Sequence, residues 1–328
     1  TSENAQSMDQ VSSQNCPVFR LVEDWAKIPE GFDLGECAGV AVDSKDRVYF
    51  HVKGPHPMVV FDRHGNFLTT WGEDIFEGAH GIAIGPDDSI YTADAGHHVI
   101  RKLTTDGELL WEYQSESARY SGTPFNRPAQ VAVSPLSGDL FVADGYGNAR
   151  IHRFNPNGQL KYSWGEPGIR PGQFVLPHNL LVDKDENIYV ADRENHRVQI
   201  FSASGKLLDL WPNIWRAAGL AIDSDGNIYV AEMPPHIFIW DSPNTGHAIS
   251  VFDKNGVLLT RFGEPGLGDF PGQLTAPHGI AVDSWGDAYI CEMPLSILGK
   301  EVVNTILHHS GHTGPLRTIV KLRRSSTI

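Results

Sequence analysis

The sequence is poor in cysteine and contains no long apolar run. Its cysteines, Cys16, Cys37 and Cys291, are too few, and odd in number, to form a disulfide framework. We therefore expect reduced thiols, with a bridge between Cys16 and Cys37 as the alternative. No apolar stretch reaches the length needed to cross a membrane, and no Asn-x-Ser/Thr sequon occurs. The composition therefore gives no reason to expect a membrane partner or glycosylation.

Positive charge is also scarce. The chain has 26 Lys and Arg residues against 40 Asp and Glu residues, which gives a formal net charge of −14. Nucleic-acid binding requires a basic face, so we expect no nucleic-acid partner. The acidic surplus is typical of a protein that stays dissolved by charge repulsion.

The first residues are polar and lack the charged and then apolar pattern of a signal peptide. We expect residues 1–17 to form a flexible tail and residues 18–328 to form a single domain. The compartment stays open, because a cytoplasmic protein and a mature secreted or periplasmic protein would have similar sequences.

A repeated unit fills most of the chain. It begins with an apolar alternation such as that of 279–282, continues through an Asx-Gly turn, and contains two further strand patterns before a fourth. Four strands in about 40–50 residues are typical of a β-propeller blade. No segment has a convincing helical pattern. We therefore predict an all-β, six-bladed β-propeller, with blades that begin near Ala38, His80, Ala129, His178, Ala218 and His278.

The two ends of the chain are predicted to share the last blade. Its third strand would be 317–322, and the N-terminal segment 18–25 would supply the missing fourth strand. This arrangement removes an exposed sheet edge. A closed ring has no need of a partner, so a monomer is the default expectation.

Two insertions interrupt the repeat, at 233–244 and 293–314, and both begin in a Glu-Met-Pro sequence, at Glu232 and Glu292. Insertions in a propeller gather on one face, where they often shape a pocket. We favour a pocket wall over decorative surface loops, because the insertions lie beside the blade that carries His278.

Histidine occupies the same repeat position in alternate blades, as His80, His178 and His278, and alanine occupies it in the other blades. In a ring of six, alternate positions are related by a three-fold axis, so the three imidazoles should converge. Three imidazoles can hold a zinc ion and leave one position open, although other divalent metals also accept imidazole. The alternative is that the rings merely pack against each other.

Several segments resemble NHL repeats, which supports the propeller fold. They are 191–198, 263–266, 272–274 and 277–282. A narrower resemblance is to the peptidyl-α-hydroxyglycine α-amidating lyases, through 143–151, 177–178, 191–195 and 277–278. This resemblance implies zinc on the three histidines, a catalytic tyrosine at Tyr146 and an active-site arginine at Arg193. The family's second arginine has no clean match, but Lys53 stands near its place.

The chain also departs from that family. The family's structural calcium would use the carbonyl groups of Val40 and Ile82, but its aspartate ligand is replaced by Gly279, which puts calcium in doubt. Ala276 replaces a family methionine, and Gly147 replaces a disulfide cysteine. The two insertions are not part of the family pattern either.

The resemblance implies a lyase that splits a small-molecule or peptide-like N-(α-hydroxyalkyl) amide. Tyr146 would remove the hydroxyl proton, and Arg193 with Lys53 would hold a carboxylate or polarise the carbonyl group. The products would be an amide and an aldehyde such as glyoxylate.

Two rival functions remain open. A zinc-dependent hydrolase of lactonase or amidase type could use Glu232 or Glu292 as its base, and a non-catalytic NHL scaffold would bind no metal. Glu232, Glu292 and His236 are candidates for substrate binding, because they lie at or within the insertions. A structural role for the two glutamates is the alternative.

Overall fold

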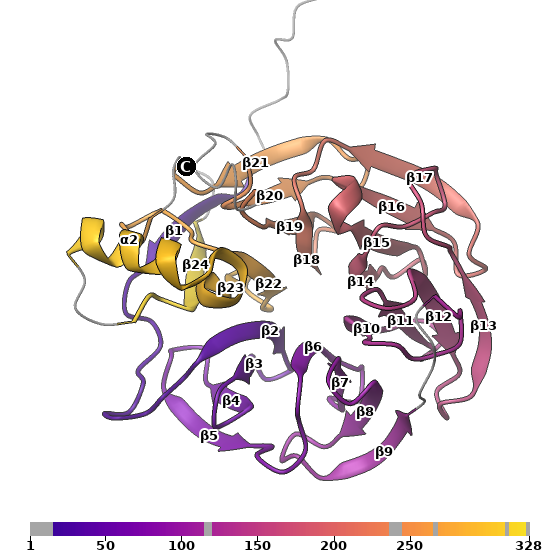
Figure 1. The fold of residues 1–328 in the computed structure, drawn as a ribbon, viewed down its shortest axis with the longest axis horizontal. Coiled ribbons are helices and arrows are strands. Elements are labelled where there is room, and N and C mark those ends of the chain that lie inside the picture. Colours follow the sequence, from indigo (N-terminus) through magenta and orange to yellow (C-terminus); the bar gives the residue numbers. More distant parts are fainter. Residues whose placement is uncertain (1–15, 115–119, 236–244, 265–267, 312–314, 326–328) are drawn as a thin grey trace, which may run out of the picture.

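The computed structural model describes residues 16–114, 120–235, 245–264, 268–311 and 315–325. In this part of the chain, six antiparallel four-stranded sheets stand around a central axis, as Figure 1 shows. The predicted six-bladed propeller is confirmed. Most of the expected tail, residues 1–15 of 1–17, lies outside the described residues.

The first three blades each run outward from an inner strand to an outer strand in chain order. The first contains β2 (Glu36–Val42), β3 (Val48–Lys53), β4 (Met58–Phe61) and β5 (Phe67–Trp71). The second contains β6 (Ala79–Ile84), β7 (Ile90–Asp94), β8 (Val99–Leu103) and β9 (Leu109–Gln114). The third contains β10 (Gln130–Val133), β11 (Leu140–Asp144), β12 (Arg150–Phe154) and β13 (Leu160–Trp164).

The next two blades follow the same order, and the last blade combines both ends of the chain. The fourth contains β14 (Pro177–Val182), β15 (Ile188–Asp192), β16 (Arg197–Phe201) and β17 (Leu207–Pro212). The fifth contains β18 (Ala217–Ile222), β19 (Ile228–Glu232), β20 (Ala248–Phe252) and β21 (Leu258–Phe262). The sixth contains β22 (Pro277–Val282), β23 (Ala288–Glu292), β24 (Ile319–Ser325) and β1 (Val18–Val22).

Aspartates form the turns between the first and second strands of several blades. Asp183 Oδ1 accepts hydrogen bonds from the backbone N–H groups of Asp185 and Asn187. Such an Asx turn replaces backbone partners that a tight reversal cannot provide. The same pair of contacts, two and four residues ahead, recurs at Asp43, Asp223 and Asp283.

A buried carboxylate ends the second strand in five blades, at Asp94, Asp144, Asp192, Glu232 and Glu292. Each accepts a backbone N–H from the segment that leads into the first strand of its own blade. These carboxylates therefore fix the loops on one face of the ring. We call the face at which the second strands end the site face.

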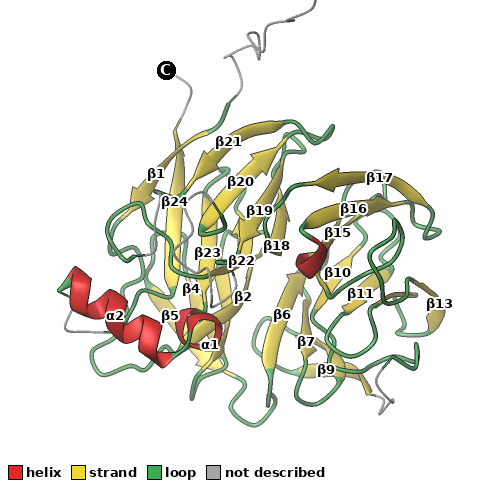
Figure 2. Cartoon of the chain, turned by 45° about the horizontal axis from the view of Figure 1, so that its top comes forward, coloured by secondary structure: helices red, strands yellow, loops and turns green. Residues whose placement is uncertain are grey.

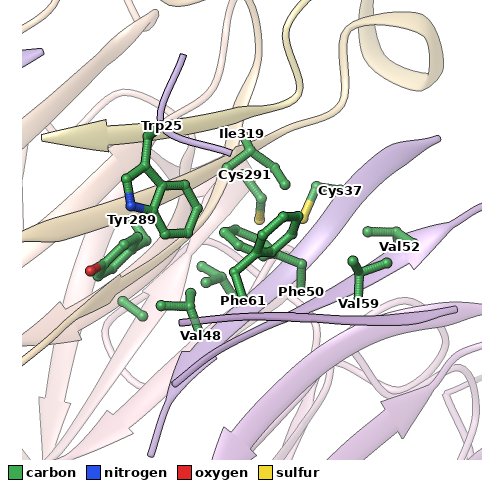
Figure 3. Close-up of a cluster of buried hydrophobic side chains, with 12 residues drawn as sticks. Trp25, Cys37, Val48, Phe50, Val52, Val59, Phe61, Tyr289, Cys291 and Ile319 are labelled. Carbon is green, nitrogen blue, oxygen red and sulfur yellow. The ribbon is translucent and has the colours of Figure 1, made fainter. Parts of the chain in front are cut away.

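The ring closes as predicted, because β1 pairs antiparallel with β24 from Val18–Ser325 to Val22–Lys321 (Figure 2). Trp25 lies where the first and last blades meet, as Figure 3 shows. Its ring centroid is 5.1 Å from that of Tyr289 in the last blade and 5.5 Å from that of Phe61 in the first. One aromatic side chain therefore joins the two blades.

The cysteines are free thiols, as expected, and the alternative bridge between Cys16 and Cys37 is not formed. Cys37 and Cys291 lie close together. Both belong to the same buried cluster at the closing interface (Figure 3). Burial, followed by the neighbouring Cys291 thiol, raises the pKa of Cys37.

The expectation of a chain without helices was wrong in the second insertion. There α1 (Pro294–Leu298) and α2 (Lys300–Ser310) form, and a short 3-10 helix, η1 (Arg193–Asn195), follows β15. Val302 and Ile306 of α2 are one helical turn apart and are buried in a small cluster of their own. Within the described residues, no helix is long and apolar enough to cross a membrane.

Removal of the closing aromatic side chain should weaken the whole ring. We expect Trp25→Ala to lower the free energy of unfolding by about 3–5 kcal/mol, measured by denaturant titration. The matched control is Trp285→Ala, because Trp285 is 67% exposed and should contribute less than about 1 kcal/mol. Equal losses in the two variants would contradict the closing role of Trp25.

Candidate metal centre

The three histidines of the repeat lie at β-bulges. Pairing between the first and second strands shifts its register between Ala79 and Gly81, so His80 is skipped in the ladder. The same shift skips His178 and His278. A bulge re-aims the side chain of the skipped residue. All three side chains therefore leave their sheets toward the axis.

The three imidazoles converge as predicted. Their ring centroids are 4.9 Å apart for His80–His178, 5.0 Å for His80–His278 and 4.7 Å for His178–His278. One ligand nitrogen from each ring lies within 4.8 Å of the others, and all three residues are buried. The geometry is that of a three-fold cluster on the ring axis.

The alanines that alternate with the histidines set the tautomer. Nδ1 of His80 lies 2.6 Å from the carbonyl oxygen of Ala129, and His178 and His278 make the same contact with Ala218 and Ala38. A carbonyl oxygen only accepts, so each Nδ1 must carry the proton. Each Nε2 is then left with a free lone pair for a metal ion.

Glycine allows this contact between neighbouring blades. Gly81 follows His80, and a Cβ atom at this position would lie 2.4 Å from the Ala129 carbonyl oxygen. A side chain at Gly81 would therefore require the two inner strands to shift. Glycine is not present in every histidine blade, because Asn179 follows His178, which makes the same contact.

Tyr146 completes the cluster. Its hydroxyl oxygen lies 2.8 Å from Nε2 of His80 and 3.0 Å from Nε2 of His178. The hydroxyl group has one hydrogen, but it faces two nitrogen lone pairs, and a third belongs to His278. This surplus of acceptors in a buried site fits a cation, and three neutral imidazoles with one open position suit zinc.

The protein keeps these histidines neutral. Burial lowers the pKa of His278 to about 3, and burial also lowers the pKa values of His80 and His178. The positive charge of Arg193 acts in the same direction on all three. Neutral imidazoles are the form that binds metal ions.

Arg193 and Lys53, predicted from the sequence, both lie on the site face. The Arg193 guanidinium is 5.9 Å from the centroid of the Tyr146 ring and is held by Glu194 at 2.8 Å. Lys53 ends β3, and burial lowers its pKa despite the opposing effect of Glu36. Within the described residues, the Lys53 ammonium group has no hydrogen-bond or ion-pair partner.

The structure adds Arg127, which sequence reasoning missed. Its guanidinium lies 5.1 Å from the centroid of the Tyr146 ring, closer than that of Arg193. Asp144 holds both the Arg127 and Tyr146 loops, because it accepts the Asn126 backbone N–H at 2.9 Å and an Asn148 amide N–H at 2.6 Å. In the sequence, Arg127 is recognisable only as an arginine before a proline, and this pair is too common to indicate a functional residue.

Glu232 and Glu292 are placed elsewhere. Both are buried, at 2% and 0% exposure, and they accept backbone N–H groups from Trp215 and Thr275. Burial raises the pKa of Glu292 to about 7. The structure does not bring either carboxylate to the three histidines, and His236 lies outside the described residues.

The far side of the cluster leaves little room. The channel beyond the histidines, lined by residues such as Gly39, Gln130 and Asn179, encloses about 10 Å³. The Ile82 carbonyl oxygen, one of the two considered for calcium, already accepts an amide N–H from Gln130 at 3.3 Å. We therefore do not propose calcium, and a ligand must approach from the site face.

Comparisons with known proteins identify relatives of this chain. A family model described as NHL repeat matches residues 174–201. The chain is 30% identical over 256 residues to peptidyl-alpha-hydroxyglycine alpha-amidating lyase 1 of Drosophila melanogaster, a match that covers 70% of this chain and 45% of that protein. It is 32% identical over 205 residues to the peptidylglycine alpha-amidating monooxygenase of Rattus norvegicus, which covers 52% of this chain and 21% of that protein.

The chain is an NHL-repeat propeller homologous to the peptidyl-α-hydroxyglycine α-amidating lyases. The matches span less than half of either relative. Among solved structures, a streptogramin B lyase superposes on this chain with a TM-score of 0.60 and 16% sequence identity. The superposition covers 94% of this chain and 98% of the streptogramin B lyase chain. At such identity the likeness concerns the fold alone.

Metal binding by the three histidines is directly testable. We expect this protein, once purified, to bind about one zinc ion per chain. The variant His178→Ala should lose the ion, because two imidazoles form a much poorer site than three. Elemental analysis after dialysis measures the metal. His308→Ala is the matched control, since His308 lies exposed on α2. Retention of a stoichiometric ion in His178→Ala would refute this site.

The metal-free protein should weaken in acid. An unfolded histidine has its pKa near 6.5, whereas that of folded His278 is about 3. The unfolded chain therefore binds the proton first, and stability is complete above pH 6.5 and falls as the pH drops toward 3. The slope should reach about 1.4 kcal/mol per pH unit for each such histidine.

Denaturant titrations in chelator at several pH values measure this slope. His278→Gln should reduce this slope by about 1.4 kcal/mol per pH unit, the contribution of one proton. An unchanged slope in that variant would show that His278 is already protonated in the folded protein.

Proposed function

We propose that this chain is a carbon–nitrogen lyase that cleaves N-(α-hydroxyalkyl) amides of the peptidyl-α-hydroxyglycine type. The observation that carries the proposal is the Tyr146 hydroxyl, which lies 2.8 Å and 3.0 Å from two imidazole nitrogens of a buried three-histidine cluster. The names of the homologous amidating lyases support the same reaction class. A zinc ion held by His80, His178 and His278 would supply Lewis-acid stabilisation of negative charge on oxygen.

The site face suits an anionic substrate. Lys53, Arg127 and Arg193 gather there although the whole chain carries a formal net charge of −14. Guanidinium groups bind carboxylates by paired hydrogen bonds. A carboxylate next to the reacting carbon, as in an α-hydroxyglycine, would be drawn to this cationic rim and would orient the substrate.

Tyr146 is placed to move the proton. The cations Arg127 and Arg193 lie over its ring and would stabilise negative charge on the phenolate. As the phenolate, Tyr146 takes the proton of the substrate hydroxyl group, the oxygen forms a carbonyl group, and the C–N bond breaks with its electron pair on nitrogen. Tyr146 then returns the proton to that nitrogen. The products are a primary amide and an aldehyde, glyoxylate where the substrate carries a carboxylate.

The alternative function is a zinc-dependent hydrolase on the same ring. It requires a base beside an attacking water, and Glu232 and Glu292 were its candidates. Both carboxylates accept backbone N–H groups, and neither contacts the three histidines within the described residues, which favours the lyase. The non-catalytic scaffold is disfavoured because it gives no use to three aligned Nε2 lone pairs.

Replacement of Tyr146 by phenylalanine should separate the candidate functions. We expect kcat for glyoxylate release from N-benzoyl-α-hydroxyglycine to fall by about 10²–10⁴-fold, because the proton-transfer group is lost. Metal content should stay unchanged, since the histidines are intact. Full turnover by Tyr146→Phe would refute the role of Tyr146, and hydrolysis of esters with no cleavage of the carbinolamide would favour the hydrolase.

A further inference from the structure

The first Glu-Met-Pro segment fixes the chain that leads into β18. The Glu232 carboxylate accepts the Trp215 backbone N–H at 3.1 Å. The Met233 backbone N–H donates to the carbonyl oxygen of Arg216 at 3.2 Å, and the Arg216 guanidinium group donates to the carbonyl oxygen of Pro234 at 2.9 Å. The start of this insertion therefore holds both the backbone and the side chain of Arg216, an arginine that has no role in the chemistry described above.

Arg216 also contacts the fourth blade. Its Nε and Nη2 atoms donate to the two oxygens of the Glu194 carboxylate, at 3.2 Å and 2.8 Å. Its backbone N–H donates to Nδ1 of His196 at 3.1 Å. Together with the bond from Nη1 to Pro234, these contacts give every guanidinium nitrogen of Arg216 a partner in the protein. Arg216 is therefore not itself available to a ligand.

Glu194 joins Arg216 to Arg193, the arginine beside Tyr146. Oε1 of Glu194 accepts from Arg193 Nε at 2.8 Å and from Arg216 Nη2 at 2.8 Å. Burial opposes ionisation of Glu194, but the two arginines outweigh this effect and lower the pKa of the carboxyl group. One carboxylate thus balances two guanidinium groups, so a net positive charge remains at this place on the site face.

Arg193 keeps hydrogen-bond donors for a ligand. Its Nε is taken by Glu194, and its Nη1 contacts the Met233 sulfur at 3.8 Å, which is a weak acceptor. Its Nη2 has no hydrogen-bond partner within the described residues. The edge formed by Nη1 and Nη2 has the geometry for paired hydrogen bonds to a carboxylate. Because Nε is held, this edge has a fixed direction.

The blade structure does not by itself require an arginine at this place. The sixth blade has its own Glu-Met-Pro segment, where the Met293 backbone N–H donates to the carbonyl oxygen of Ala276 at 3.0 Å. Ala276 and Arg216 occupy the same repeat position, two residues before the histidine or alanine of the inner strand. Alanine is therefore sufficient for the backbone contact, and the arginine side chain is needed only for what it binds.

We propose that Arg216, acting through Glu194, positions Arg193 to hold the substrate carboxylate. The proposal rests on the proposed lyase function and makes Arg216 and Glu194 positioning residues of that site. A guanidinium group and a carboxylate pair best through two parallel hydrogen bonds. Without Arg216, Glu194 would turn both oxygens to Arg193, and Arg193 would lose the donors and the charge that the substrate needs.

The test measures carboxylate binding without turnover. N-acetylglycine carries the amide and the carboxylate of the substrate but lacks the hydroxyl group, so the lyase cannot cleave it. Isothermal titration should detect its binding to the unmodified protein, and Arg216→Gln should weaken this binding about tenfold, because charge-assisted hydrogen bonds are lost. Equal affinities of the two proteins, or no binding by the unmodified protein, would overturn the proposal.

A second substitution separates positioning from a role in folding. Glu194→Gln, added to Arg216→Gln, removes the negative charge that Arg193 would otherwise have to balance alone. We expect this double variant to bind N-acetylglycine within about threefold of the unmodified protein, because the paired donors of Arg193 are free again. A double variant as weak as Arg216→Gln would show that Arg216 supports only the fold, and the proposal would fail.

Denaturant titration checks that each variant folds. If Arg216→Gln does not fold, Arg216→Lys replaces it and should weaken binding about threefold, since an ammonium group cannot reproduce the paired contact with Glu194. Full affinity in Arg216→Lys would then count against the proposal. Arg47→Gln is the matched control, because Arg47 pairs with Asp43 at 2.6 Å in the turn between β2 and β3, away from the site face. An equal loss in this control would also overturn the positioning role.

The outcomes separate the two proposals. Binding of N-acetylglycine that depends on Arg216 and is restored by Glu194→Gln, without cleavage of N-benzoyl-α-hydroxyglycine, would preserve the positioning role and refute the lyase. Cleavage of that compound by a protein whose affinity for N-acetylglycine is unchanged in Arg216→Gln would do the reverse.

Discussion

The hydrogen bond from each histidine to the next blade is the contact on which the centre depends. Nδ1 of each imidazole lies 2.6 Å from a backbone carbonyl oxygen of the adjacent blade, so a single contact fixes the ring orientation, the tautomer and the spacing of two inner strands. Burial then keeps the imidazoles neutral. Two features of the fold make these contacts possible. The β-bulges direct the histidine side chains toward the axis, and the closure of the ring places the last blade beside the first.

Buried polar groups elsewhere in the ring show why position decides function. In the third blade, Ser163, His152 and Asp144 are joined by hydrogen bonds of 2.6 Å and 2.9 Å, which is the residue order of a hydrolytic triad. His152 and Asp144 are fully buried, however, and Asp144 also holds the loop of Asn126. A related contact occurs at the same repeat position in the fourth blade, between Asp192 and Gln199. The hydrogen-bonded Ser163, His152 and Asp144 are therefore part of the blade structure.

The sequence predicted the ring, its closure and the convergence of three histidines because these follow from periodicity. A repeat shows which residues share a place, and symmetry then brings alternate places together. Tyr146 was predicted only through the family resemblance, and the structure places its hydroxyl group within hydrogen-bond distance of His80 and His178. Arg127 was missed because its position depends on a left-handed backbone turn and on the shared Asp144 carboxylate, neither of which has a periodic signature. The helices at 294–310 were missed because their apolar face is short and meets residues from distant parts of the chain.

The contact between His278 and Ala38 joins residues 240 positions apart. During synthesis on the ribosome, the first two ligands are made long before the third, and the last blade also waits for β24 to meet β1. The emerging chain therefore has no complete three-histidine cluster until the last blade has been translated. A metal ion that needs all three histidines would therefore bind late, and a chain truncated before the final blade would lack His278.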